Sequence, residues 1–318
     1  MKTLVVPTIR ENSIKEFIEN WDLSQWDKLI IVEDNPEKTF QIKTTIPFEH
    51  YSWKEIEEDL EENSWIISKR DSACRCYGFL KAYQLGSQWT FTLDDDCFST
   101  RFNHCQEHIK NMENHPKWIS LIQGVRTRGL PYFNLGTLSN VVANVGLWSG
   151  IPDFDSIQVL SEGGYVTNFQ SPEISCIIPH KQIAPLCGMN LAFRTNVSCL
   201  FYFPLMGEGY PYRRFDDIFC GIIVKKICDH LNLSISYGTP IVEHKKQSDP
   251  LKNLEKETPG IIHNEEFWEI IENIPLTQNS PEGCMIEVAK SLQKHNNNYL
   301  STLGNAMEIW TKLFKHKF

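Results

Sequence analysis

The chain has 318 residues, of which 41% are hydrophobic and 22% are charged, and its formal net charge is −9. These values are ordinary for a globular protein, and the negative charge excludes a nucleic-acid binder that relies on a broad basic face. No run of about 18 apolar residues occurs, so no transmembrane segment is predicted, and ten cysteines without paired CxxC spacing argue against a zinc site. Residues 1–13 lack the features of a signal peptide, so we expect a cytoplasmic protein with reduced thiols.

The N-terminal part of the chain alternates short apolar strands with amphipathic helices. Predicted strands span residues 4–7, 28–32, 65–67 and 89–93, and predicted helices span residues 14–21 and 71–85. This alternation predicts an α/β fold with a mostly parallel sheet flanked by helices. Ligands of such sheets bind at the carboxyl ends of the strands, where residues 7–10, Asp34 and residues 94–96 are expected.

The C-terminal part is richer in helices. We predict a long helix over residues 216–231, a strand over residues 240–242 and two helices within residues 283–314. One face of the last helix carries apolar side chains at helical spacing, which indicates core packing or a subunit contact. These are Leu300, Leu303, Met307, Trp310 and Phe314.

An acidic triplet directly follows the strand over residues 89–93. Three adjacent carboxylates repel each other, and a hard divalent cation would offset that repulsion. In extended backbone Asp94 and Asp96 point to the same side of the chain, so we predict that they bind Mn²⁺ or Mg²⁺ next to Asp95. The alternative is a solvated acidic turn. His244, after the strand at 240–242, is a further candidate metal ligand, although a lone histidine is more often structural.

Residues near the other predicted strand ends suit a nucleotide. Asp34 follows the second strand, where a base or ribose is commonly held, and a turn-forming Asp is the alternative. Arg70 and Arg75 flank the start of a helix, which favours a diphosphate; an ordinary cap with surface arginines is the alternative. The nucleotide-sugar-binding residues predicted here are Pro7, Thr8, Arg10, Asp34, Arg70, Asp71, Arg75, Asp94 and Asp95.

A second acidic pair, Asp216 and Asp217, begins the predicted helix over residues 216–231 and follows Arg213 and Arg214. Carboxylates at this position are stabilised by the helix dipole, so capping is one interpretation. The other is a general base or a clamp on sugar hydroxyls, and we predict Asp216 and Asp217 as catalytic residues.

Several of these segments match one known family, in order, over residues 4–270. They comprise residues 6–10, 29–34, 71–76, 93–98, 146–148, 151–153, 187–193, 205–207, 215–217 and 227–231. The segments DSACRC (71–76) and CGMNLAF (187–193) are long and specific. On these segments the chain resembles the reversibly glycosylated polypeptides, also known as UDP-arabinopyranose mutases.

The resemblance implies a glycosyltransferase-A-like, Rossmann-like fold, with a nucleotide-sugar domain over residues 1–275 and a helical extension over residues 276–318. It implies a divalent metal, a UDP-sugar bound partly by Asn190, and interconversion of pyranose and furanose rings, with a role in cell wall or surface polysaccharide. It also implies reversible self-glycosylation on Arg128, which begins the matching segment RGLPYFNL (128–135). The family's second arginine in this segment is absent, because residues 134–136 read Asn-Leu-Gly.

Three functions remain open at this point. The first is a UDP-sugar mutase, and the second is a metal-dependent glycosyltransferase that moves sugar to an acceptor, with Asp217 as general base. The third is a non-catalytic subunit of a hetero-oligomer, against which the complete acidic triplet argues. A furanose product formed from UDP-sugar without acceptor would distinguish the first function from the second. The sequence does not decide whether the chain forms a homo-oligomer.

Overall fold

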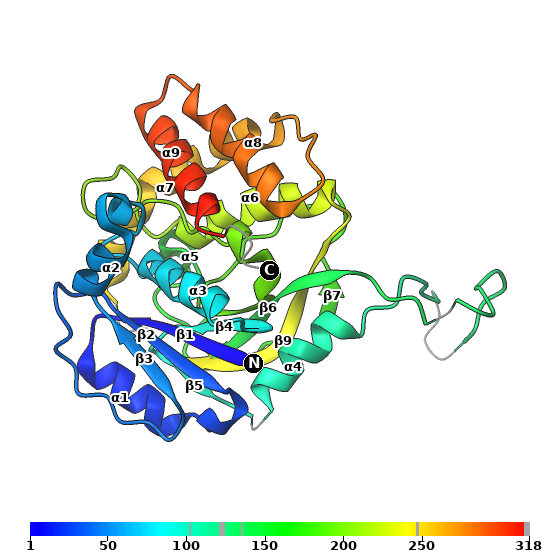
Figure 1. Ribbon diagram of the computed structural model, residues 1–318. Coiled ribbons are helices and arrows are strands. Elements are labelled where there is room, and N and C mark those ends of the chain that lie inside the picture. Colours follow the sequence, from blue (N-terminus) through cyan, green and yellow to red (C-terminus); the bar gives the residue numbers. More distant parts are fainter. Residues whose placement is uncertain (102, 121–124, 135, 246–247, 315–318) are drawn as a thin grey trace.

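The computed structural model describes residues 1–101, 103–120, 125–134, 136–245 and 248–314. Within these residues one mixed sheet is flanked by helices (Figure 1). The strands are β1 (Lys2–Thr8), β2 (Lys28–Glu33), β3 (Phe48–Tyr51), β4 (Trp89–Leu93), β5 (Cys97–Ser99), β6 (Val141–Gly150), β7 (Ser175–Ile177), β8 (Asn190–Arg194) and β9 (Ser234–His244). The helices are α1 (Glu11–Asn20), α2 (Trp53–Leu60), α3 (Arg75–Gln84), α4 (His104–Glu113), α5 (Ser156–Ser161), α6 (Asp216–His230), α7 (Pro250–Glu272), α8 (Pro281–Gln293) and α9 (Asn298–Lys312).

The sheet order is β3-β2-β1-β4-β8-β6-β9-β5, and β7 pairs with β9. Strands β3, β2, β1 and β4 are parallel, which confirms the predicted α/β alternation in this part of the chain. Strand β8 is antiparallel to both β4 and β6, whereas β6 and β9 are parallel to each other. The carboxyl ends of β1, β2 and β4 therefore meet at one edge of the sheet.

The predicted strand over residues 65–67 is wrong. Residues Glu61–Ile66 form a 3₁₀ helix instead, and Ile66 and Ile67 are buried in the core. The edge of β2 that a third strand would use is already paired with β3, which the sequence analysis missed. The segment FEHY of β3 has no clear apolar alternation, since all four side chains are exposed or only partly buried.

Helix α3 begins where the sequence predicted a cap. The Asp71 side chain accepts a hydrogen bond from the amide of Ala73 at 3.0 Å, ahead of the short 3₁₀ turn Ser72–Cys74 that leads into α3. Such a cap satisfies an amide that has no partner within the helix. Arg70 precedes the cap with a left-handed φ of 58°.

Helices α8 and α9 pack against each other at the C-terminal end of the described chain (Figure 1). The apolar face of the last predicted helix is buried within the subunit, because Leu303, Met307 and Trp310 are each 0% exposed. The Trp310 indole donates to the carbonyl of Cys199 at 3.0 Å, which ties α9 to the rest of the chain. Core packing is therefore the correct interpretation of that face. No helix among the described residues is long and apolar enough to cross a membrane.

Candidate active site

A cavity of about 740 Å³ lies at the carboxyl ends of β1, β2 and β4. This volume is within the range of small-molecule sites. Many residues predicted to bind nucleotide sugar or metal meet at its wall, although they come from distant parts of the sequence. They are Pro7, Thr8, Arg10, Asp34, Arg70, Asp71, Asp94, Asp95, Asp96 and His244.

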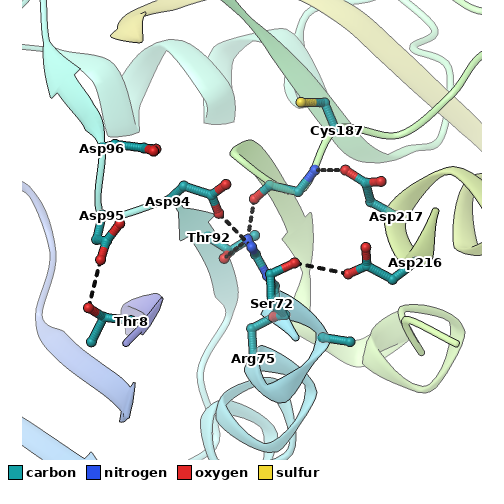
Figure 2. Close-up of polar contacts among 12 residues, drawn as sticks. Thr8, Ser72, Arg75, Thr92, Asp94, Asp95, Asp96, Cys187, Asp216 and Asp217 are labelled. Carbon is teal, nitrogen blue, oxygen red and sulfur yellow. Dashed lines mark hydrogen bonds and ion pairs between the residues drawn. The ribbon is translucent and has the colours of Figure 1, made fainter. Parts of the chain in front are cut away.

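The acidic triplet divides its carboxylates between two sides (Figure 2). Asp95 turns toward β1, where it accepts a hydrogen bond from Thr8 Oγ1 at 2.7 Å and pairs with Arg10 Nη2 at 2.5 Å. Asp94 and Asp96 point the other way, although residues 94–97 form a turn and not the expected extended backbone, with the Cys97 amide donating to the Asp94 carbonyl at 3.1 Å. Asp95 thus anchors the loop after β1, whereas Asp94 and Asp96 are directed away from that loop.

His244 ends β9 beside Asp96, and its ring is fixed in orientation. Its Nδ1 lies 2.9 Å from the carbonyl oxygen of Ile151 and donates to it, which leaves Nε2 as the nitrogen nearer Asp96. That Nε2 lies 3.9 Å from Asp96 Oδ1. Burial and the neighbouring Asp94 carboxylate raise the pKa of Asp96 to about 6, with His244 acting in the opposite direction.

These side chains fit a divalent cation only in part. Among the described residues, no group of three or more His, Cys, Asp or Glu side chains is close enough to hold a metal by itself. One reason is that the Asp94 carboxylate is held by Arg75 at 2.5 Å. Asp94, Asp96 and His244 therefore do not form the three-ligand metal site that the sequence predicted. The arrangement suits instead a Mg²⁺-like cation that completes its shell with phosphate oxygens.

Arg75 lies behind the cavity and does not line it, contrary to its predicted contact with a diphosphate. Its side chain is 1% exposed. Nε donates to the carbonyl of Ser72 at 3.0 Å, Nη1 donates to Thr92 Oγ1 at 3.1 Å and to the carbonyl of Gly188, and Nη2 holds Asp94 (Figure 2). A guanidinium with this many partners positions Asp94.

Asp34, Trp53 and Arg70 form one corner of the cavity. Asp34 Oδ1 accepts hydrogen bonds from the Trp53 indole at 2.7 Å and from the backbone amide of Arg70 at 3.0 Å. The Arg70 guanidinium lies 4.9 Å from the centre of the Trp53 ring. Burial raises the pKa of Asp34, and these hydrogen bonds oppose the shift. Asp34 therefore orients Arg70 and Trp53 at the end of β2.

Asp216 and Asp217 lie close to the cavity without lining it, so the structure does not place them where a substrate would contact them directly. Asp216 accepts a hydrogen bond from Ser72 Oγ at 3.2 Å, and Asp217 accepts one from the amide of Gly188 at 2.8 Å (Figure 2). Burial raises the pKa of both carboxyls, and the pKa of Asp217 is raised further by Asp216. Asp71, which does line the cavity, has its pKa raised to about 8 by burial and by the nearby Asp216.

Asn190, which was predicted to bind the nucleotide sugar, does not line the cavity either. Its side chain is 0% exposed and contacts the core, with Oδ1 2.9 Å from His108 Nε2 and Nδ2 donating to the carbonyls of Leu147 and Pro240. A Cβ atom on Gly146 would lie 2.2 Å from Asn190 Nδ2, so the adjacent strand must approach this amide closely. The physical reason is the central position of β8 in the sheet, which buries its first residue.

Arg128 is exposed and belongs to the segment between α4 and β6. The described part of that segment extends away from the body of the molecule (Figure 1). Arg128 does not line the cavity of its own chain. Within one chain, Arg128 therefore does not lie where it would contact a sugar bound in that cavity.

Five further charged residues line the cavity and were not predicted as site residues: Asp153, Glu208, Arg213, Arg214 and Lys256. Asp153 follows β6 and accepts a hydrogen bond from the Cys187 thiol at 3.4 Å. Arg213 and Arg214 come from the loop before α6, and Lys256 comes from α7. Asp153 belongs to the segment 151–153 that carried the family resemblance, whereas Lys256 has no recognisable sequence signal.

Some cations that line the cavity are paired with carboxylates, and others are not. Within the described part of the chain, Arg70, Arg213, Arg214 and Lys256 form no ion pair with any carboxylate. Arg10, by contrast, is held by Asp95. Unpaired cations at a cavity wall favour a polyanionic ligand such as a diphosphate.

Comparison with known proteins places the chain in one group. The family model described as "Reversibly glycosylated polypeptide" matches residues 2–317. UDP-arabinopyranose mutase 2 of Arabidopsis thaliana is 32% identical over 96% of this chain and 89% of its own length. A probable UDP-arabinopyranose mutase 1 of Solanum tuberosum is 33% identical over 96% and 88%, and UDP-arabinopyranose mutase 1 of Oryza sativa subsp. japonica is 32% identical over 96% and 88%.

Proposed function

The chain belongs to the reversibly glycosylated polypeptide family, and from this premise we propose that it is a UDP-sugar mutase that interconverts pyranose and furanose rings. UDP-arabinose is the first candidate substrate, because the curated relatives are named as UDP-arabinopyranose mutases. The observation that carries the proposal beyond family membership is that the unpaired cations line the same cavity as Asp94 and Asp96.

Ring contraction is an isomerisation and needs no second substrate. The bond between the anomeric carbon and the diphosphate oxygen breaks, the sugar ring opens and closes through a different hydroxyl oxygen, and the same diphosphate oxygen bonds to the anomeric carbon again. The protein must therefore stabilise the departing UDP and keep it close. Arg70, Arg213, Arg214 and Lys256 would share the diphosphate charge during this step.

Mn²⁺ or Mg²⁺ is part of the proposal, with Asp94 and Asp96 as carboxylate ligands and His244 Nε2 as a third contact. When bound, such a cation supplies Lewis-acid stabilisation of the diphosphate. The chain's own contribution is to hold the ligands: Arg75 fixes Asp94, and the Ile151 carbonyl fixes the tautomer of His244.

The nucleoside end of the substrate would lie against the loops after β1 and β2. This end of the cavity is lined by Thr8, Arg10 and Asp34. The Trp53 indole donates a hydrogen bond to Asp34. The sugar would then lie toward Asp153 and Lys256, at the opposite end of the sheet edge.

Reversible attachment of sugar to Arg128 remains a proposal. In that step a guanidinium nitrogen bonds to the anomeric carbon, the bond to the diphosphate oxygen breaks, UDP leaves, and one guanidinium proton passes to a carboxylate. A base is required because a guanidinium is protonated at neutral pH and becomes a nucleophile only when it loses a proton. The exposed Asp153 carboxylate in the cavity suits this role better than the enclosed Asp216 and Asp217.

We also propose that the protein works in the cytoplasm. All ten cysteines are unpaired, and nine of them are buried. Free thiols of this number suit a reducing compartment.

The test is incubation with a panel of UDP-sugars and Mn²⁺ without any acceptor, followed by chromatography of the products. A mutase yields the furanose form of one UDP-sugar under these conditions. Turnover that appears only after an acceptor is added would identify a glycosyltransferase instead.

A further inference from the structure

The described residues between α4 and β6 form a projecting arm, defined here as residues 115–120, 125–134 and 136–139. Its described residues extend away from the body of the molecule, to the right in Figure 1. The base of the arm is held by backbone hydrogen bonds from Lys117 to Thr137 at 2.8 Å and from Ser139 to His115 at 2.7 Å. Farther out, the Arg126 guanidinium donates to the carbonyl of Pro131 and lies 4.7 Å from the centre of the Tyr132 ring.

The arm exposes large apolar side chains. Exposed fractions are 48% for Trp118, 68% for Ile119, 49% for Val125, 82% for Tyr132, 99% for Phe133 and 48% for Leu138. A monomer rarely leaves apolar side chains of this size gathered on one projection, because their burial is favourable by about 25 cal/mol per Å². We therefore expect another protein surface to cover the apolar side chains of the arm.

Charge indicates the kind of partner. Every charged side chain of the arm is a cation, namely Lys117, Arg126 and Arg128, whereas the next segment, residues 141–180, contains four acidic residues and no Lys or Arg. The whole chain carries −9, so the three arm cations leave −12 for the remaining residues. A basic, apolar arm is thus complementary to the body of its own kind of chain.

The acidic segment also presents apolar side chains next to the cavity. Ile157 and Leu160 of α5 are 53% and 39% exposed, and Leu251 at the start of α7 is 66% exposed. Helices α5 and α7 are joined by the hydrogen bond from the Ser156 amide to Glu257 Oε2 at 2.7 Å. We call this surface the α5 face: Ile157, Leu160 and Leu251, with the carboxylates of Asp153, Asp155 and Glu162.

The arm and the α5 face of one chain lie at opposite ends of β6. The arm leads into Val141, the first residue of β6, and α5 follows Gly150, the last one. A ten-residue strand spans about 30 Å. Because the arm also extends away from the body, it is directed away from the cavity of its own chain.

We propose that the arm of one copy of this chain docks on the α5 face of a second copy, and that the two copies exchange arms in this way around a two-fold axis. Each arm then covers its apolar side chains and brings Arg128 to the partner copy's cavity beside Asp153. The assembly follows from apolar exposure and charge; the role of Arg128 in the shared cavity rests on the proposed mutase function. Such an isologous exchange closes after two copies.

Sedimentation velocity tests the assembly without reference to activity. We expect the wild-type chain to be a dimer, and we expect Phe133→Asp and Ile157→Asp each to shift it to a monomer. Ile262→Asp, at a side chain that is 66% exposed outside both surfaces, is the matched control and should remain a dimer. A wild-type monomer at all concentrations, or a dimer that tolerates both variants, overturns the proposal. Circular dichroism checks that each variant is folded.

Co-expression tests the shared cavity. One chain carries Arg128→Ala, and the other carries Asp94→Asn with Asp96→Asn, so neither is active alone. With exchanged arms, half of the dimers are mixed and one of their two cavities is intact, which predicts about one quarter of wild-type mutase activity. Absence of any recovery in a mixed dimer overturns the sharing of cavities. If the wild-type chain itself converts no UDP-sugar, the proposed function has failed, and sedimentation still decides the arm contact.

Discussion

The Arg75 guanidinium holds the Asp94 carboxylate at 2.5 Å from a position that is only 1% exposed. A buried cation thus determines where the first carboxylate of the acidic triplet points. We predict that Arg75→Lys lowers the affinity for Mn²⁺ by about 10- to 100-fold, because an ammonium cannot reach Asp94, Thr92 and the Gly188 carbonyl at once.

Isothermal titration with Mn²⁺ in the presence of UDP measures this effect, and a thermal melt separates it from loss of folding. Arg194→Lys is the control, since Arg194 lies over the Trp89 ring and donates to the carbonyl of Val141 away from the cavity. Equal Mn²⁺ affinity in Arg75→Lys and wild type would show that Arg75 does not position Asp94.

The second prediction concerns pH. Burial and Asp216 raise the pKa of Asp71 to about 8, so Asp71 is uncharged at neutral pH and becomes a carboxylate as pH rises through 8. The new negative charge would oppose the diphosphate in the cavity. We therefore expect KM for the UDP-sugar to rise above pH 8 in the wild-type chain and to rise less in Asp71→Asn.

Asparagine caps a helix about as well as aspartate, so the variant should fold normally. Steady-state kinetics between pH 6.5 and 9.5, covering the range within about 1.5 units of that pKa, compare the two proteins. Parallel KM profiles would argue that Asp71 is already charged at pH 7 or lies away from the diphosphate.

The third prediction concerns Lys256, a cavity residue without an ion-pair partner among the described residues. Lys256→Ala should reduce kcat/KM for the UDP-sugar by about 10-fold, the loss of one charge-assisted contact. Lys252→Ala, one turn earlier on α7, removes the same charge from an exposed position that does not line the cavity. Similar kinetics for the two variants would exclude Lys256 as a diphosphate contact.

The fourth prediction uses two glycines of the loop before α6. Both have left-handed φ angles, 85° for Gly207 and 87° for Gly209. A Cβ atom on Gly207 would lie 2.9 Å from the carbonyl oxygen of Lys69, whereas a Cβ atom on Gly209 would meet open space. Alanine at either position should cost about 1–2 kcal/mol of stability for the backbone conformation alone.

Gly207→Ala should in addition displace the loop that carries Arg213 and Arg214, and so lower kcat/KM more than Gly209→Ala does. Thermal melts and initial rates measured on both variants give the comparison. If Gly209→Ala is the more damaging change for catalysis, the contact with Lys69 is not what places this loop.

Local patterns predicted the parts of the fold that local physics determines. Strands β1, β2 and β4 are buried apolar runs, Asp71 caps the turn that leads into α3, and α6 begins at Asp216. The antiparallel insertion of β8 between β4 and β6 depends on contacts distant in sequence, and it is this insertion that buries Asn190. No periodicity within the segment 190–194 could have indicated it.

Most carboxylates of the cavity were predicted from the sequence, whereas Asp153, Glu208 and the cations Arg213, Arg214 and Lys256 were not. Strand ends in a parallel sheet converge, so Thr8, Asp34 and Asp94 could be grouped from sequence alone. Lys256 belongs to a helix that continues through Pro259, and a proline in that position normally argues against a helix. The direction of the arm that carries Arg128 is a tertiary feature without a local signal.

The central claim is that this chain interconverts the two ring forms of a UDP-sugar, and approach to equilibrium from both sides tests it most directly. Purified protein with Mn²⁺ is incubated separately with UDP-arabinopyranose and with UDP-arabinofuranose, without acceptor, and both mixtures are resolved by chromatography over time. We predict that both mixtures reach the same ratio of the two forms, and that Asp94→Asn with Asp96→Asn leaves each substrate unchanged. Unaltered substrates with the wild-type chain, or release of free arabinose and UDP without a furanose–pyranose exchange, would contradict it.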